Sequence, residues 1–385
     1  MSGSLTVLVL ASIATLVYHY LGYPAVLWIL AKVAPRPTKT GSGQPRVSML
    51  VAAYNEAAVI EDKLNNALDL DYPHLDIIVV SDGSTDGTEA IARRFEDRGV
   101  VVVEVSPRQG KGNALNRGAE QARGEILLVS DANAMVARDA LTHLVRHFDD
   151  PSVGCVSGHV APEPARDGSD ISGSEGLYWR YEAFLKRAES RIASTTGVVG
   201  SLLALRRELF APIPAGLIND DSFLMLHIMR QGFRVLYEPT AHCWRRSSRT
   251  MQDELRRRKR ITSGRYQHMM RFSEWPWNSP FTVFFLFSHK YLRLLLPFFM
   301  IAALLGNLTV LFFSPVSWLM LLTLTGQAAF YALAAVGAIL SRTPNRRWRP
   351  ATLAYYITVG NLGLAYGFLQ HVRGRHTVLW QKAAR

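Results

Sequence analysis

The sequence has little cysteine, and two widespread nucleotide-binding motifs are missing from it. Only two cysteines occur in 385 residues, which excludes a disulfide-stapled module and fits a reducing compartment. No GxGxxG fingerprint follows the first expected strand and no GxxxxGK[ST] loop occurs, so NAD-type redox chemistry and a Walker-type phosphate site are disfavoured. Apolar residues make up 49% of the chain and the net charge is +12. With its apolar residues concentrated at the two ends, the chain is neither disordered nor an ordinary soluble enzyme.

The N-terminal end is predicted to be a membrane anchor. Residues 5–29 contain no Asp, Glu, Lys or Arg, and about 20 such residues span a bilayer core as a helix. A secretory signal is the competing interpretation, but signals begin with basic residues, whereas here Lys32, Arg36 and Lys39 follow the apolar run. Because positive residues stay in the cytoplasm, we expect residues 1–33 to form a span with its N-terminus outside.

The C-terminal third holds three further candidate spans. They cover about residues 291–313, 315–340 and 351–370, and residues 271–290 before them are expected to form an interfacial helix. The arginines between the last two spans place that link in the cytoplasm. One more crossing would then put the basic tail, residues 371–385, outside. Either the last segment does not fully cross or the charge rule fails there, and the sequence leaves both possibilities open.

The middle of the chain, residues 44–270, is predicted to be a cytosolic α/β domain. Apolar runs at 47–52, 77–80, 100–105 and 126–129 alternate with helical stretches, which is typical of a mostly parallel sheet covered by helices. Ligands bind such sheets beyond the carboxyl ends of the strands. Polar residues stand at these ends: Asn55, Glu56, Asp82, Lys111, Asp131 and Asn133.

Each of these strand-end residues also has a purely structural interpretation. Asp82 begins a good β-turn, Lys111 stands in what could be an exposed turn, and Asp131 could cap a strand end. A carboxylate in that position can instead hold Mg²⁺ or Mn²⁺ against a diphosphate, since hard cations prefer oxygen ligands. The basic surplus fits attraction to anionic lipid or to an anionic substrate, and no nucleic-acid motif is present.

Six segments in order resemble one known family. They read VSMLVAAYNE, VVSDGSTDGT, QGKGNALNRG, VSDANA, INDDSFLMLHIMRQGFRVLYEP and RRRKRITSG, within residues 44–265. This order resembles the family 2 glycosyltransferases, specifically the membrane-embedded group of hyaluronan, cellulose and other exopolysaccharide synthases. The resemblance implies an α/β GT-A-like nucleotide-sugar-binding domain joined to transmembrane helices.

The resemblance also implies roles for individual residues. Asp221 would be the catalytic base, and Asp131 with Asn133 would take the places of a metal-binding Asp-x-Asp. The residues implied to bind the nucleotide sugar are Tyr54, Asn55, Glu56, Asp82, Lys111, Asp131 and Arg260. Those implied or considered for the acceptor are Gly200, Asp220, Arg257 and Trp179; Trp179 is also interpreted as a core residue.

Three positions depart from the family pattern. Asn133 replaces a metal-binding aspartate, and an amide oxygen adds no charge to a site for Mg²⁺ or Mn²⁺. Ile261 replaces a tryptophan that would stack on the acceptor sugar, and Arg257 replaces a glutamine in the same motif. Ala52 stands where a proline is usual.

These observations together predict a multi-pass enzyme of the inner or plasma membrane with a cytosolic catalytic domain. It would be an inverting, metal-dependent transferase that moves a sugar from a nucleotide sugar, by resemblance a UDP-sugar, to a growing polysaccharide. The alternatives are transfer of a single sugar to a lipid-linked acceptor, or an inactive nucleotide-binding transport subunit. Membrane lipids are expected partners, nucleic acid is not, and a homo-oligomer or an export partner is possible.

Overall fold

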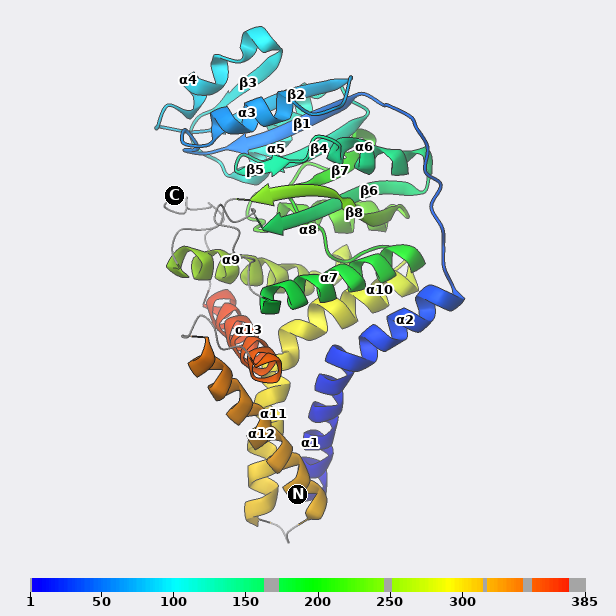
Figure 1. Cartoon of the computed structure of the whole chain (residues 1–385), viewed down its shortest axis with the longest axis vertical. Helices are drawn as coiled ribbons and strands as arrows, with labels where there is room; N and C mark the ends of the chain where they lie inside the picture. Colours follow the sequence, from blue (N-terminus) through cyan, green and yellow to red (C-terminus); the bar gives the residue numbers. More distant parts are fainter. Residues whose placement is uncertain (1, 163–172, 246–250, 314–316, 342–347, 374–385) are drawn as a thin grey trace.

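The computed structural model describes residues 2–162, 173–245, 251–313, 317–341 and 348–373 of the chain. A sheet-containing domain forms one end of the molecule and long helices form the other (Figure 1). Helices α7 (Gly173–Ile192), α9 (Met251–Met269) and α10 (Pro280–Phe285) lie between these two parts. The domain that carries the predicted site residues therefore rests on a layer of helices.

The described strands form one mixed sheet of eight, in the order β3-β2-β1-β4-β7-β6-β8-β5. β1 pairs in parallel with β2 and β4, β2 with β3, and β6 with β8, whereas β7 is antiparallel to both β4 and β6. The bounds are β1 Val47–Ala53, β2 Leu75–Asp82, β3 Val100–Val105, β4 Ile126–Asp131, β5 Ala134–Val136, β6 Val153–Pro162, β7 Leu203–Arg206 and β8 Arg234–Arg245. The predicted α/β fold with a mostly parallel sheet is confirmed; the antiparallel strands β5 and β7 were not anticipated.

Helices cover both faces of the sheet. Met49 and Val51 of β1 pack in one core with α3, and Leu50 between them packs in another core with α5. This alternation follows from the pleat of a strand, and it explains why β1 is apolar throughout. The covering helices are α3 Ile60–Leu68, α4 Thr88–Arg93, α5 Lys111–Gln121, α6 Ala140–Val145 and α8 Asp220–Arg230. Short 3₁₀ turns lie at Glu96–Arg98, Arg146–Asp149, Arg207–Leu209 and Phe272–Glu274.

Three described helical stretches are long and apolar enough to cross a membrane: Gly3–Val33, Pro280–Phe313 and Trp318–Leu340. The first combines α1 (Ser2–Val17), a π-helical turn η1 (Tyr18–Gly22) and α2 (Tyr23–Val33). The second combines α10, a π-helical turn η6 (Leu286–Tyr291) and α11 (Leu292–Phe313), and the third is α12. The predicted boundary between an interfacial helix and a span at residue 290 therefore does not coincide with a helix end.

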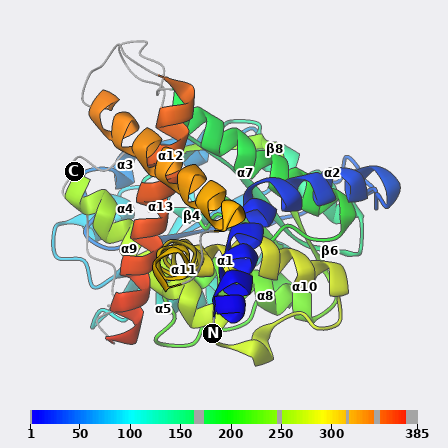
Figure 2. The ribbon, with the colours of Figure 1, turned by 90° about the horizontal axis from the view of Figure 1, so that it is seen from below.

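The last helix, α13 (Arg349–Val372), runs across the long axis of the molecule. It is foreshortened in Figure 1 and extended in Figure 2, where it passes beside α9. Tyr266 of α9 has ring contacts with Phe368 and His371 of α13, and Gly367 lies against Thr262. The three candidate spans do not include α13, and both possibilities for the last segment stay open. The basic tail beyond residue 373 is outside the described residues.

Candidate active site

The loop after β1 is tied to the loop after β2. Oδ1 of Asn55 accepts a hydrogen bond from the backbone N–H of Thr85 at 2.8 Å, and Ser84 Oγ accepts one from the N–H of Asn55 at 3.1 Å. Asn55 has φ +53°, a left-handed conformation that asparagine tolerates better than most residues. The guanidinium of Arg108 lies 3.4 Å from the centroid of the Tyr54 ring. The first two predicted nucleotide-binding segments thus form one structure.

Asp82 connects these loops to Lys111. It is fully buried at the end of β2, and its two oxygens accept hydrogen bonds from the backbone N–H groups of Gln109 (2.7 Å) and Gly110 (2.8 Å). Gly110 directly precedes Lys111, the first residue of α5. Asp82 therefore fixes the start of α5 as well as standing where the family resemblance places a nucleoside contact.

Lys111 joins two carboxylates from different parts of the chain. Its Nζ lies 2.9 Å from Oδ1 of Asp131 and 3.0 Å from Oδ2 of Asp220. Burial alone would lower the pKa of Lys111, but the two carboxylates outweigh burial and raise it. Burial would likewise raise the pKa of Asp131, but Lys111 and Arg245 hold it well below its usual range. Lys111 and Asp131 are therefore both charged at neutral pH.

Lys63 stabilises the turn that contains Asp131. This lysine is fully buried, and its Nζ donates to Ser130 Oγ and to the carbonyl of Ala134, both at 2.7 Å. Burial lowers the pKa of Lys63 to about 8. On the other side, Ser201 Oγ donates to Oδ2 of Asp131 at 2.6 Å. Asp131 is thus positioned before any ligand binds.

Asp221 occupies the start of α8 beside Lys111. Its Oδ2 accepts a hydrogen bond from the N–H of Gly200 at 3.2 Å, and its Oδ1 accepts one from the N–H of Ser222 at 2.7 Å. Burial and then the neighbouring charge of Asp220 raise its pKa, although Lys111 opposes this. A carboxylate with a raised pKa accepts a proton more readily than an ordinary one, which suits a general base.

One cavity of about 220 Å³ brings most of these groups together. Of the predicted site residues, those lining it are Lys111, Asp131, Gly200, Asp220, Asp221 and Arg260. Ile261, which replaces the expected tryptophan, also lines it. The predicted residues Tyr54, Asn55, Glu56 and Asp82 are not among the lining residues; they belong to the connected segments at the ends of β1 and β2. Asn133 and the partly exposed Trp179 are not among the lining residues, and the side chain of Arg257 lies outside the described residues.

Two lining residues near Asp131 were not found from the sequence. Ser201 contacts Asp131 directly, and Arg245 at the end of β8 has Nη1 3.8 Å from Oδ2 of Asp131. Arg245 ends β8, a strand that the sequence analysis did not predict, so its position at a strand end could not be used. Ser201 offered no signal.

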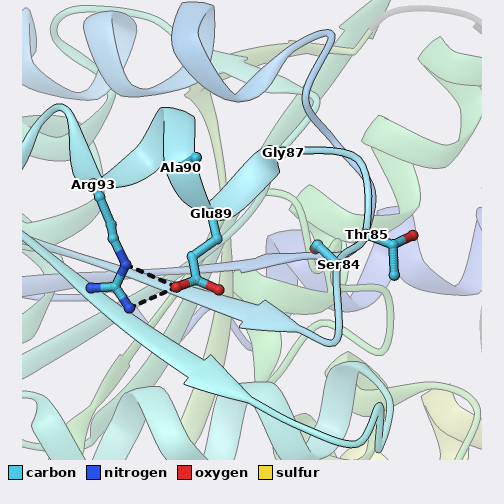
Figure 3. A pocket seen from close by; sticks show the side chains of 6 residues that line it. All are labelled: Ser84, Thr85, Gly87, Glu89, Ala90 and Arg93. Carbon is cyan, nitrogen blue, oxygen red and sulfur yellow. Dashed lines mark hydrogen bonds and ion pairs between the residues drawn. The ribbon is translucent and has the colours of Figure 1, made fainter.

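A second hollow lies on the outer face of the domain and has a different character. Ser84, Thr85, Gly87, Glu89, Ala90 and Arg93 line it, as Figure 3 shows. Glu89 and Arg93 form an ion pair with each other at 2.6 Å, one helical turn apart on α4. No lysine and no pair of carboxylates lines this hollow, so it lacks the groups that a transfer reaction needs.

The residues that could hold a divalent metal are Asp131 and Asn133, which supply a carboxylate and an amide oxygen at the end of β4. The described part of the chain contains no group of three His, Cys, Asp or Glu side chains arranged for a metal. Mg²⁺ in nucleotide sites is commonly held by one or two carboxylates together with substrate phosphates and water. Such a limited donor set therefore fits a metal that arrives with a diphosphate.

Comparison with known proteins identifies the domain. Residues 48–213 match the family "Glycosyl transferase family 2". The chain contains a family 2 glycosyltransferase domain. The predicted resemblance is confirmed, and so is the predicted enzyme class. The family match ends before Asp221 and Arg260. It assigns no role to any single residue, so the roles of all the site residues stay predictions.

Relatives of this chain include polysaccharide synthases. It is 29% identical over 232 residues to the poly-β-1,6-N-acetyl-D-glucosamine synthase of Staphylococcus aureus (strain COL), covering 58% of this chain and 56% of that protein. It is 27% identical over 237 residues to the synthase of the same name from Staphylococcus epidermidis, covering 60% and 57%. The chain thus spans little more than half the length of these curated relatives.

A solved structure matches almost the entire chain. It is the mannosyltransferase PcManGT from Pyrobaculum calidifontis in complex with GDP-Man and Mn²⁺. The match has a TM-score of 0.72 and 26% identity, and it covers 96% of this chain and 100% of the other. The GT-A-like fold and the arrangement of helices around it are therefore shared with a glycosyltransferase.

Proposed function

We propose that this chain is a membrane-bound inverting glycosyltransferase that moves a sugar from a nucleotide sugar to a growing polysaccharide. The observation that carries the proposal is the cavity in which Asp221, with its raised pKa, lies beside the Lys111–Asp131 pair. This reaction needs a base that takes the proton of the acceptor hydroxyl. It also needs cations, and carboxylates that can hold a metal, to offset the charge of the departing diphosphate.

The donor half of the site holds the nucleotide sugar. The loops around Asn55 and Asp82 bind the nucleoside, by family resemblance a uridine, and Lys111, Arg245 and Arg260 offset the charge of the diphosphate. Asp131 and Asn133 would hold Mg²⁺ or Mn²⁺, which would offset the charge of the leaving group. The Mn²⁺ in the PcManGT complex supports a divalent cofactor.

The acceptor half carries out the proton transfer. An acceptor hydroxyl beside Gly200 gives its proton to the carboxylate of Asp221 as its oxygen bonds to the anomeric carbon. The bond from that carbon to the diphosphate breaks, and its electron pair leaves with the nucleoside diphosphate. In this proposal Asp221 acts as the base and no covalent intermediate forms, so a single displacement inverts the anomeric centre. Holding both substrates together makes the attack effectively unimolecular.

The polymer acceptor is supported by the names of the curated relatives. The second candidate is transfer of a single sugar to a lipid-linked acceptor. Ile261 favours this candidate, because it lines the cavity where the polymer synthases have an aromatic residue to stack on the acceptor. The three candidate spans and the bracketing of residues 44–270 by apolar helices support a cytosolic catalytic domain at the inner or plasma membrane.

The proposal is tested by replacing Asp221 with asparagine. The Asp221→Asn variant is expected to lose about 10²–10⁴-fold in transfer rate, because it lacks the base. Its affinity for UDP with Mn²⁺, measured by isothermal titration, is expected to stay close to that of the wild type. Asp97→Asn, an exposed aspartate outside the cavity, is the matched control and keeps its activity.

Two outcomes would count against the proposal. Transfer by Asp221→Asn above about a tenth of the wild-type rate would remove Asp221 from the role of base. An α-linked product from an α-linked donor, seen by NMR of the product, would rule out inversion. GDP-sugars assayed beside UDP-sugars decide the donor nucleotide.

A further inference from the structure

Helix α9 contacts the start of α8, where the proposed base Asp221 lies. Nε2 of the buried His268 in α9 lies 3.2 Å from the carbonyl oxygen of Asn219, the residue before α8. The same oxygen accepts the N–H of Phe223 at 3.2 Å, a hydrogen bond of the first turn of α8. Because a carbonyl oxygen can only accept, Nε2 of His268 is the donor. His268 therefore holds a backbone atom two residues before Asp221.

The side chain of Asn219 is also bound to α9. Asparagine commonly begins a helix because its side chain can accept a hydrogen bond from an N–H of that helix. Asn219 makes no such bond, and its Nδ2 instead donates to the carbonyl of Ile261 at 3.1 Å. A Cβ atom added to Gly264 would lie 2.6 Å from Oδ1 of Asn219, so glycine permits this close approach. The start of α8 is thus attached to α9 in place of being capped by its own side chain.

Gln267 of α9 holds the loop that leads to Asn219. Its Nε2 donates to the carbonyl of Gly216 at 2.9 Å, and its Oε1 accepts the N–H of Ile218 at 3.3 Å. Gly216 has φ +88°, a left-handed conformation that glycine adopts without strain, so the chain turns where Gln267 binds it. One amide group thus fixes the turn that precedes α8.

The ring of His268 is held at its second nitrogen as well. Nδ1 lies 3.5 Å from Oε2 of Glu274, and Oε1 of Glu274 lies 2.9 Å from Nη1 of Arg271. His268 also lines the cavity that contains Asp221. An imidazole that is held at both nitrogens presents its Nε2–H in one direction, as the positioning of a backbone carbonyl requires.

Another face of α9 packs on the helices of the apolar part. Tyr266 Oη donates to the carbonyl of Leu294 in α11 at 2.6 Å, and Thr262 lies against Gly367 of α13. Thr262 and Tyr266 are four residues apart and share a face, which differs from the face that contacts the start of α8. Helix α9 lies between α8 and α13 (Figure 1). It therefore connects the start of α8 with α11 and α13.

The position of a general base decides whether it can act. A base must lie within about 3 Å of the hydroxyl that it deprotonates, and a misplacement of about 1 Å can lower a rate about 10²-fold. Gly200 and Ser222 orient the carboxylate of Asp221, whereas the start of α8 sets the position of its backbone. Lys111 also pairs with Asp131, at 2.9 Å, so it stays in the donor half of the site if α8 moves. Loss of the contacts from α9 is therefore expected to reduce transfer more than donor binding.

We propose that His268 and Gln267 are positioning residues, which place the carboxylate of Asp221 for proton transfer by fixing residues 216–219 and the start of α8. This inference rests on the proposed function, because it gives the two side chains a part in the same reaction. Neither residue touches the reacting atoms or takes the proton.

Two substitutions of His268 test the proposal in the full-length chain. His268→Phe keeps a planar ring and removes the donor, whereas His268→Gln places an amide N–H as many bonds from Cβ as Nε2 is. His268→Phe is expected to lower kcat about tenfold or more. Its KM for the donor, and its affinity for UDP with Mn²⁺ measured by isothermal titration, are expected to stay unchanged. His268→Gln is expected to retain about half of the wild-type kcat or more.

Hydrogen exchange measures the same contacts without turnover. The amide hydrogens of residues 218–223, which include those of Ile218 and Phe223, are expected to exchange about tenfold faster in His268→Phe than in the wild type. His268→Gln is expected to keep the wild-type exchange rate. Absence of turnover with every donor and acceptor would refute the proposed function, whereas unchanged exchange in His268→Phe would overturn the positioning role alone.

Two further substitutions in α9 complete the set. Gln267 is partly exposed, so Gln267→Met removes both hydrogen bonds to the loop with little risk to folding, and it decides the matter if His268→Phe does not fold. It is expected to lower kcat about threefold to tenfold. Lys259→Gln is the control, because Nζ of Lys259 lies 4.1 Å from the centroid of the Tyr366 ring in α13 and the residue does not line the cavity. This variant is expected to keep the wild-type kcat.

Three results would overturn the proposal. One is a wild-type kcat in a folded His268→Phe or in Gln267→Met. Another is an equal loss of kcat in His268→Phe and His268→Gln, which would mean that the shape of the ring matters and the donor does not. A loss of affinity for UDP in parallel with kcat would show instead that α9 supports the donor half of the site.

Discussion

Lys111 begins α5 and Asp220 begins α8, and Nζ of Lys111 lies 3.0 Å from Oδ2 of Asp220. Asp221, the next residue, thereby lies between one acidic neighbour that raises its pKa and one basic neighbour that lowers it. The proton affinity of the proposed base is therefore set by groups that can be changed one at a time.

Asp220→Asn is expected to move the acid limb of the pH–rate profile to lower pH. The proposed base works as a carboxylate, so the rate rises with pH through its pKa, and that pKa is raised in part by the charge of Asp220. Removing this charge lowers the pKa of Asp221. The measurement is kcat against pH at saturating donor. A profile that changes in height and keeps its acid limb in place would contradict this account.

Asp82→Asn is expected to destabilise the domain more than Asp76→Asn on the same strand. Asp82 is fully buried and accepts two backbone hydrogen bonds, and an amide can accept at only one of its two positions. One unsatisfied buried N–H costs about 1–3 kcal/mol of unfolding free energy. Asp76 pairs with the exposed Arg46, so its replacement is expected to have little effect. Denaturant unfolding followed by tryptophan fluorescence compares the two variants.

Asn133→Asp is expected to lower the Mn²⁺ concentration needed for half-maximal activity. The substitution adds a second carboxylate to the proposed metal site beside Asp131, and carboxylate charge strengthens binding of hard cations. Titration of the EDTA-treated enzyme with Mn²⁺ measures the shift. An unchanged titration midpoint would place the metal away from this turn.

Gly367→Ala is expected to loosen the packing of α13 on α9. A Cβ atom at Gly367 would lie 2.4 Å from Cγ2 of Thr262, whereas one at Gly363 would meet nothing within 4 Å. Both substitutions favour a helix to the same degree, by about 1 kcal/mol, so their difference isolates the steric clash. The melting temperature of the full chain in detergent is expected to fall for Gly367→Ala and to hold or rise for Gly363→Ala. Equal melting temperatures would mean that α13 can shift at no cost.

The parallel half of the sheet and the donor side of the cavity could be predicted, because short sequence segments contain the patterns that indicate them. The run of residues 100–105 forms β3 with the expected bounds, and Asp82 and Asp131 each end the strand that was expected to carry them. Parallel strands bring their carboxyl ends to one edge of the sheet. The polar residues that follow successive predicted strands could therefore be placed in one site.

The cavity wall next to Gly197 could not be predicted, because its residues come from segments whose dominant patterns indicated other structures. Lys290 lies in an apolar run that indicated only a membrane helix, and Lys186 lies in a helix without a motif. Both lysines lie near Gly197 because of how α7 packs against η6, and this packing cannot be predicted from any short sequence segment. Likewise Asp220, expected near the acceptor, pairs with Lys111, and this pairing depends on the relative position of α5 and α8.

The segment from Thr195 to Ser201 contacts charged residues along one wall of the cavity. Thr196 contacts Glu189, Gly197 lies against two lysines, Gly200 donates to Asp221 and Ser201 donates to Asp131. If an incoming acceptor displaces this stretch, the hydrogen bonds to both Asp131 and Asp221 change. Seven residues of backbone therefore connect the position of Asp131 with that of Asp221.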